Sequence, residues 1–170
     1  MTAVLRPATA DDLMTVGALH SRSRQNAYRD FLPAEALAAD SGDALGQWWS
    51  ERWKWERETH LMTVLEDGER LVGFSYVGPH ELDPVGYGEL SAIHLEPDQR
   101  GRGLGRALMI DALDTLSRRG WSRAALWVLT DNKPAREFYR RGGWTADGIA
   151  RTEHVGSALA AQLRYVRDLP

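Results

Sequence analysis

The 170-residue chain contains no cysteine. This absence excludes disulfides, thiolate catalysis and thiolate-bound zinc, and it fits a reducing compartment, so we expect a cytoplasmic protein. No apolar run approaches the length that crosses a membrane, and residues 1–13 hold no apolar core of a secretory signal. A membrane is therefore not an expected partner.

Basic runs and metal-binding spacings are missing as well. The formal net charge is -3 and no segment is dominated by Lys and Arg, so nucleic acid is not an expected partner. The five histidines form no pair at the spacing of metal ligands, and no metal is expected. We find no repeat and no interdomain linker. With 43% hydrophobic and 26% charged residues, residues 1–170 are expected to form one domain with its own core.

One stretch organises the predicted fold: a strand, a glycine-rich turn and a helix. Residues 90–95 are mostly apolar and lie between a glycine and a proline, as in a buried strand. Leu104 opens a run in which apolar residues recur at every helical turn up to Leu116. Between them, Arg100-Gly-Arg-Gly-Leu-Gly105 interleaves glycines with arginines. Glycines let a ligand approach the backbone, and a helix N-terminus binds phosphate, so this turn is a predicted anion site.

Two familiar glycine-rich loops do not fit this turn. A P-loop requires Gly-Lys-Ser/Thr after four intervening residues, but Arg106-Ala107 stands there. A dinucleotide fingerprint requires its third glycine where Arg106 or Leu108 stands. A nucleotide-binding regulatory domain is therefore disfavoured. For the loop taken alone, a plain connection with solvated arginines stays an alternative.

The rest of the chain alternates strands and helices. Further strands are predicted at 4–6, 61–66, 71–77, 124–129, 144–149 and 159–166. Helices are predicted at about 9–28, 34–39, 43–58, 104–119 and 132–141. The turn Asp67-Gly-Glu-Arg70 is the clearest hairpin signal. The order predicts an α/β fold whose mixed sheet has a parallel pair at its centre and antiparallel strands beside it.

Three segments resemble the GCN5-related N-acetyltransferase (GNAT) superfamily. Arg100-x-x-Gly-x-Gly after a strand is similar to the family's acyl-CoA loop. Asn132-x-x-Ala-x-x-Phe-Tyr-x-x-x-Gly-Trp144 is similar to its second motif, with Trp in place of Phe. Residues 23–33 resemble one branch of the superfamily, although Arg24 replaces the commoner Trp and leaves the shape of the acceptor pocket open. The resemblance covers nearly the whole chain and implies one GNAT domain over residues 1–170. It also implies a mostly antiparallel sheet whose central parallel strands splay apart around a pantetheine arm.

The resemblance implies acetyl-CoA as co-substrate. Its pyrophosphate is expected on the amides from Gly101 to Arg106, with added bonds from Arg100 or Arg102. The N–H groups of the central strand are expected to face the thioester oxygen. Asn132 is expected to cap its helix, to bind the pantetheine arm, or to do both. The expected cofactor-binding residues are Ile93, His94, Leu95, Arg100, Gly101, Arg102, Gly103, Leu104, Gly105, Arg106, Asn132 and Tyr139.

Tyr139 and Glu89 are the expected catalytic residues. Tyr139 follows Asn132 by two helical turns, where the family places a tyrosine that protonates the departing thiolate; packing alone is the alternative. Glu89 opens the central strand, where several family members place a basic carboxylate; a solvated glutamate is the alternative. His80 and Glu81 in the preceding loop are weaker candidates for the base. The side chain of His94 is expected on the opposite sheet face from its two neighbours.

The predicted function is transfer of an acetyl group from acetyl-CoA to a primary amine of a small molecule or peptide. Without cysteine, direct transfer in a ternary complex is expected. The alternative is an acyl-CoA sensor without turnover. The predicted helix 43–58 carries four tryptophans, more than one core stripe can hide, so one is expected to wall the acceptor site or a homodimer contact. Further acceptor-site candidates are His20, Arg24 and Tyr28.

Overall fold

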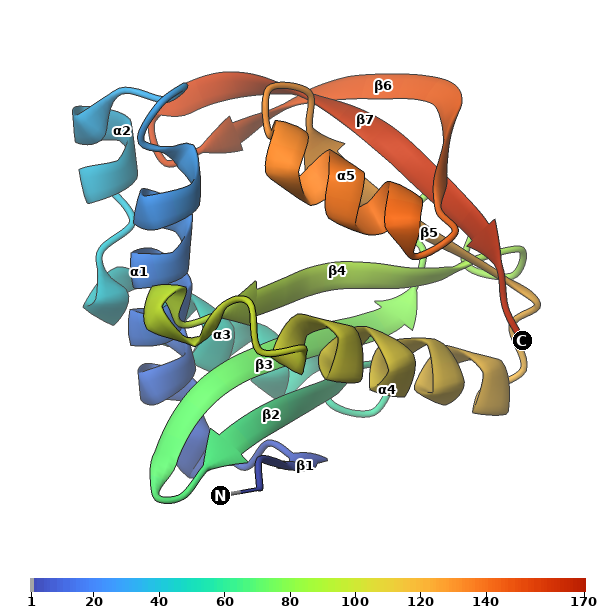
Figure 1. The fold of residues 1–170 in the computed structure, drawn as a ribbon, viewed down its shortest axis with the longest axis horizontal. Helices are drawn as coiled ribbons and strands as arrows, with labels where there is room; N and C mark the ends of the chain where they lie inside the picture. The colour runs from blue at the N-terminus through green and yellow to red at the C-terminus, as the bar shows by residue number, and fades with distance from the viewer. Residues whose placement is uncertain (1) are drawn as a thin grey trace.

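The computed structural model describes residues 2–170 and shows one seven-stranded sheet flanked by helices (Figure 1). The strands are β1 (Val4–Pro7), β2 (Leu61–Asp67), β3 (Arg70–Pro79), β4 (Gly88–Leu95), β5 (Arg123–Leu129), β6 (Thr145–Val155) and β7 (Ala158–Asp168). The α-helices are α1 (Leu13–Tyr28), α2 (Ala34–Ala38), α3 (Gly42–Glu56), α4 (Leu104–Arg118) and α5 (Lys133–Arg141). Two short 3-10 turns, η1 (Ala10–Asp12) and η2 (Pro97–Gln99), precede α1 and α4. Across residues 2–170, no helix is long and apolar enough to cross a membrane.

The sheet has the order β1-β2-β3-β4-β5-β7-β6, and β4 and β5 are its parallel neighbours. These two strands pair only at Gly88–Ala124 and Glu89–Ala125, although each continues for several residues. Parallel strands that stay adjacent would keep pairing along their length, so β4 and β5 separate beyond Glu89. Figure 1 shows them close at one end and diverging toward α1. The predicted fold class, including the splayed parallel pair, is confirmed.

A bulge in β4 interrupts the alternation of its side chains. Tyr76 of β3 pairs with Ala92, whereas the next residue, Val77, pairs with Leu90. Ser91 is therefore an extra residue, and its hydroxyl donates a hydrogen bond to the Tyr76 carbonyl at 3.3 Å. One extra residue shifts the alternation of side chains by one position. Residues before the bulge therefore point to the opposite face from the one that a regular count from residues after it would give.

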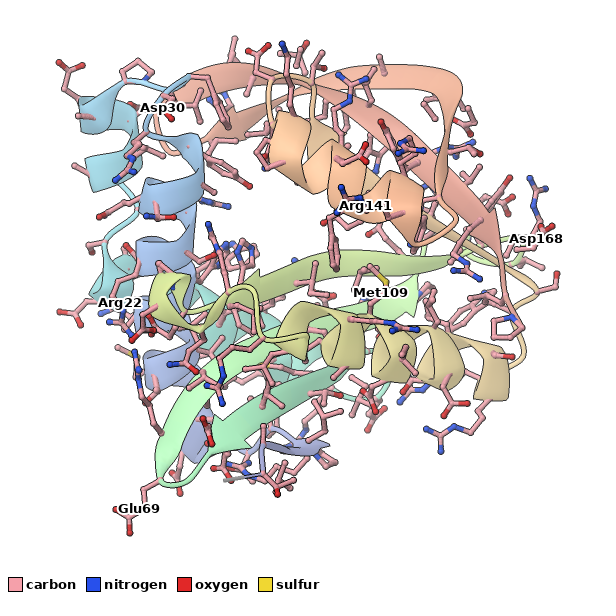
Figure 2. All side chains as sticks on the ribbon, viewed as in Figure 1. Arg22, Asp30, Glu69, Met109, Arg141 and Asp168 are labelled. Carbon is pink, nitrogen blue, oxygen red and sulfur yellow. The ribbon has the colours of Figure 1, made fainter. Side chains whose placement is uncertain are left out.

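The bulge decides where Glu89 points. Leu90 and Ile93 both pack on the α4 face, toward which Met109 is directed (Figure 2). In a regular strand Glu89, four residues before Ile93, would share that face. The bulge places Glu89 on the other face, the one covered by α1 and α3. His94 lies there too, with its ring 4.4 Å from the His20 ring, which confirms the predicted orientation of His94.

Two apolar clusters hold helices on the two faces of the sheet. The cluster under α4 includes Val77, Leu90, Met109, Ala112, Leu116, Leu126 and Trp144. The cluster under α1 and α3 includes Leu13, Val16, Leu19, Trp49, Met62, Val64 and Phe74. Packing from both sides fixes β3 and β4 as a rigid base for the site.

The largest boundary error concerns β6. The strand predicted at 144–149 instead spans Thr145–Val155, and Trp144 precedes it as a fully buried core residue. Most β6 side chains are exposed on both faces, so no alternation of apolar and polar residues marks the strand in the sequence.

Two packed histidines, the buried His20 and the half-buried His94, predict that the fold loses stability in mild acid. Trp49 donates its indole N–H to Nδ1 of His20 at 3.0 Å. An indole can only donate, so this nitrogen carries no proton and His20 is neutral. Burial lowers the pKa of His20 well below its usual value and, with Arg24 and Arg100 nearby, lowers the pKa of His94 to about 3.

In the unfolded chain these histidines take up protons at a higher pH than in the folded protein. The free energy of unfolding is therefore at its full value above about pH 6.5, and it decreases as the pH falls toward the folded-state pKa values. Each histidine is expected to contribute about 1.4 kcal/mol per pH unit over that window. Urea unfolding between about pH 7 and pH 5.5 measures the slope. The His20→Asn variant, which keeps an uncharged acceptor for Trp49, should flatten it. The same change at exposed His154 should not; equal slopes in both variants would contradict the assignment.

Candidate active site

A groove of about 1390 Å³ follows the splayed end of β4 and β5. Its walls come from β4, the turn before α4, α5, β6, α1 and α3. It brings together most of the sequence-predicted residues, namely Glu89, Ile93, His94, Leu95, Arg100, Gly101, Gly103, Gly105, Arg106, Asn132 and Tyr139. Two predicted residues do not line it: Leu104 packs in the core and Arg102 binds elsewhere.

The glycine-rich turn forms one end of the groove with its backbone exposed. Gly101 and Gly103 adopt φ angles of +77° and +78°, which disfavour other residues. A Cβ atom at either position would meet no atom within 4 Å, so the space beside the turn is open. Gly103 is the N-cap of α4, whose first N–H groups have no partner within the helix. Together these features offer amide donors and a positive dipole end to an anion.

The arginines of this turn have different surroundings. Arg102 forms an ion pair with Asp67 at 3.1 Å. Arg100 lines the groove and donates to Oδ1 of Asn26 at 2.9 Å. Arg106 also lines the groove, and within residues 2–170 its guanidinium has no hydrogen-bond or ion-pair partner. Of the arginine side chains, Arg100 and Arg106 are thus the better placed to meet an anion, rather than Arg102.

The N-cap of α5 and the second half of this helix each supply one groove residue. Oδ1 of Asn132 accepts the N–H of Ala135 at 3.3 Å, so the predicted helix cap is present. The Tyr139 ring lies against Trp144 and Tyr165, and its hydroxyl has no hydrogen-bond partner within the described residues. Burial, with a smaller contribution from Tyr28, raises the pKa of Tyr139 above its usual value. The phenol is therefore held in its protonated form.

Glu89 belongs to a buried chain of polar contacts. His80 is fully buried, and its Nδ1 lies 2.7 Å from Oε1 of Glu89. On the other side of the ring, Nη1 of Arg164 lies 3.3 Å from Nε2 of His80. Arg164 in turn pairs with Asp147 at 2.5 Å. The chain links the loop before β4 to β6 and β7.

This chain assigns the protonation of His80. A guanidinium can only donate, so Nε2 of His80 must accept and the ring proton lies on Nδ1. Nδ1–H then donates to Oε1 of Glu89, which lines the groove, and within residues 2–170 the other carboxylate oxygen has no hydrogen-bond partner. His80 is fully buried with both nitrogens engaged, an arrangement suited to orienting Glu89.

The tryptophans of α3 divide between packing and exposure. Trp49 is buried in the α1 and α3 cluster and Trp53 packs against it. Trp48 is 47% exposed and lines the groove, with the Arg52 guanidinium 5.2 Å from its ring. Trp55 is 81% exposed. Two of the four, Trp48 and the core residue Trp49, thus line the groove, and a role for one of them at the acceptor site or in a homodimer contact stays a prediction.

Several site residues escaped the sequence analysis. Arg164, Asp147, Arg151 and Trp127 were not singled out, although they surround or line the Glu89 part of the groove. One signal was present: Arg164 sits between Leu163 and Tyr165 in an apolar strand, where a charged side chain needs a buried partner. Within residues 2–170 no group of three His, Asp or Glu side chains is arranged to hold a metal ion.

A family model for the acetyltransferase (GNAT) family matches residues 25–144, more than two thirds of the chain. The chain belongs to this family. An uncharacterized N-acetyltransferase of Methanocaldococcus jannaschii is 34% identical over 106 residues, which cover 61% of this chain and 47% of that protein. A second, YuaI of Bacillus subtilis, is 26% identical over 80% of this chain and 76% of its own length. A mycothiol acetyltransferase of Saccharopolyspora erythraea is 32% identical over 54% of this chain and 29% of its own length. The match thus spans about half of the Methanocaldococcus protein and under a third of the mycothiol acetyltransferase.

Solved structures share the GNAT fold over nearly the full chain. The PaiA N-acetyltransferase of Thermoplasma acidophilum, determined in complex with coenzyme A, has a TM-score of 0.78 at 16% identity and 99% coverage of both chains. The ribosomal-protein-S18-alanine N-acetyltransferase of Escherichia coli has a TM-score of 0.67 at 20% identity, with 99% of this chain and 94% of that chain covered. At these identities the likeness establishes the fold.

Proposed function

We propose that the protein is an acetyl-CoA-dependent N-acetyltransferase that acts on a primary amine of a small molecule or peptide. The observation that carries this proposal is one groove with an open anion-binding turn at one end and an oriented carboxylate, Glu89, at the point where the strands begin to separate. Membership of the acetyltransferase family and the coenzyme A complex of the similar PaiA structure support it.

Acetyl-CoA would bind with its pyrophosphate on the amides from Gly101 to Arg106. Charge-assisted bonds from Arg100 and Arg106 would add about 1.5–3 kcal/mol each when well placed. Micromolar affinity requires about 8 kcal/mol, so these contacts would supply a large share of it. The pantetheine arm would enter between β4 and β5 and pass Asn132, which would bring the thioester close to Tyr139.

The transfer would proceed by direct attack of the amine on the thioester. Glu89 accepts a proton from the ammonium group, and the freed nitrogen attacks the carbonyl carbon. The N–H groups of Ile93 and Leu95 stabilise the oxyanion of the tetrahedral intermediate. As the carbon–sulfur bond breaks, Tyr139 donates its proton to the thiolate, and the nitrogen loses its second proton to water. Water then returns a proton to Tyr139, and Glu89 releases its own proton to solvent. An acetylated amine and coenzyme A leave the groove, and no group on the protein is acetylated.

Substitutions at Gly103 test the cofactor site. Gly103→Asp introduces a negative charge where the pyrophosphate would lie, whereas Gly103→Asn has nearly the same shape and tolerates positive φ about as well. Calorimetric titration with acetyl-CoA is expected to show binding at least about 10-fold weaker for Gly103→Asp than for Gly103→Asn. The Asp carboxylate would repel the negatively charged pyrophosphate, whereas the Asn amide carries no charge. Equal affinities in two folded variants would contradict this site.

A further inference from the structure

One guanidinium in the Glu89 part of the groove lacks an ionic partner. Besides Arg100 and Arg106 at the glycine-rich end, three arginines line the groove: Arg24, Arg52 and Arg151. Arg24 pairs with Asp40 and Arg52 with Glu56. Within the described residues no carboxylate lies within 4 Å of Arg151. The charge of Arg151 is therefore available to a ligand.

Arg151 is also held in place. Its Nε donates to Oε1 of Gln162, its neighbour across the β6–β7 pair, at 2.7 Å. Its guanidinium carbon lies 4.2 Å from the centre of the Trp127 ring. These contacts fix the plane of the guanidinium and leave its two terminal nitrogens without a protein partner. Burial lowers the pKa of Arg151, as expected for a cation that has lost water and gained no close anion.

The free guanidinium and the carboxylate of Glu89 belong to the same part of the groove. Gln162, which binds Arg151, lies two residues from Arg164 on β7, so both side chains share one sheet face. Arg164 contacts His80, and His80 binds Glu89. The charge of Glu89 is close enough to contribute to the pKa of Arg151, together with the exposed Glu81 and Glu153.

We propose that the acceptor is a primary amine that also carries a carboxylate, as in an amino acid. The amino group would lie at Glu89, and the carboxylate would take two parallel hydrogen bonds from the terminal nitrogens of Arg151. A planar fork that is already oriented recognises a carboxylate with little loss of side-chain freedom. This inference rests on the proposed function and names the substrate class of the same site.

Matched acceptors test the proposal. Each amino acid of a panel is compared with its carboxamide, which keeps the amino group and removes the negative charge, and thiol release from acetyl-CoA is followed. The parent enzyme is expected to prefer the acid in kcat/KM by about 10- to 100-fold, the value of a charge-assisted hydrogen bond pair. Peptides with an acidic second residue form a third arm, which shows whether the carboxylate belongs to a free amino acid or to a peptide side chain.

The Arg151→Gln variant is expected to lose this preference, with the larger loss for the acid and a small change for the carboxamide. Arg151→Lys should restore part of it, because the charge returns without the fork. The control is Arg118→Gln on the outer surface of α4, and acetyl-CoA titration shows that each variant is folded. If amines are acetylated without regard to a carboxylate, or if Arg151→Gln weakens both acceptors equally, the inference is wrong while the proposed function stands. If no amine at all releases thiol, the proposed function fails, and this inference with it.

Discussion

The Glu89→Gln variant is expected to lower kcat by about 10²- to 10⁴-fold, the usual contribution of a positioned base. Glutamine has the same shape, and its amide oxygen can still accept the Nδ1–H of His80. It cannot take a proton from the acceptor ammonium. The Michaelis constant for acetyl-CoA should change little, because Glu89 lies at the far end of β4 from the glycine-rich turn. Steady-state kinetics across the pH range measures both effects.

Glu81→Gln is the matched control, since it removes the same charge from the neighbouring loop and should leave kcat near that of the parent. The acidic limb of the pH–rate profile should disappear in Glu89→Gln alone. A parental rate and profile in this variant would move the base to Glu81 or to solvent. His80 would not take its place, because it is fully buried between Glu89 and Arg164.

The Tyr139→Phe variant is expected to lower the rate of the chemical step by about 10²-fold. A free thiol has a pKa near 8.5, so protonation of the leaving group helps at neutral pH without being obligatory. The raised pKa of Tyr139 keeps its proton in place up to strongly basic pH, so the effect should persist across neutral pH. The change removes one oxygen and leaves the ring against Trp144. Single-turnover mixing with acetyl-CoA isolates this step.

Two comparisons separate acid catalysis from packing. Tyr87→Phe deletes a hydroxyl from a residue that does not line the groove, and it should not slow the step. An acyl donor whose thiol leaves more easily should shrink the Tyr139→Phe deficit. Parental single-turnover rates in Tyr139→Phe would show that the tyrosine only packs.

Local signals predicted the structure of the glycine-rich turn and of the α5 cap at one end of the groove. The glycines before α4 and the Asn132 cap of α5 act within a few residues of themselves, so their patterns reveal strand, turn and helix directly. The same is true of the β2–β3 hairpin, whose turn residues are adjacent in the chain. In these places sequence and structure agree to within a few residues.

The environment of Glu89 could not be predicted, because it depends on residues far apart in the chain. The bulge at Ser91 appears only in the register between β3 and β4, and a simple count along the strand puts Glu89 on the wrong face. His80 meets Arg164 across 84 residues. The residue pattern along one strand does not specify such a contact, because the contact depends on how the neighbouring strands pair in the folded sheet.

Arg151 shows the same limit. In the sequence it stands in a polar stretch of β6 that has no strand signature. Its isolation from carboxylates emerges only when β6 pairs with β7 and when Arg24 and Arg52 find their own partners. That Arg151 has no carboxylate partner therefore becomes visible only in the folded groove.

The most direct test of the central claim is thiol release from acetyl-CoA in the presence of a panel of primary amines, with the acetylated product identified by mass spectrometry. The account predicts release that requires an amine, equals the acetylated amine in amount and leaves the protein unacetylated. Acetyl-CoA binding without amine-dependent release from any member of the panel would contradict it and would identify a module that senses acyl-CoA.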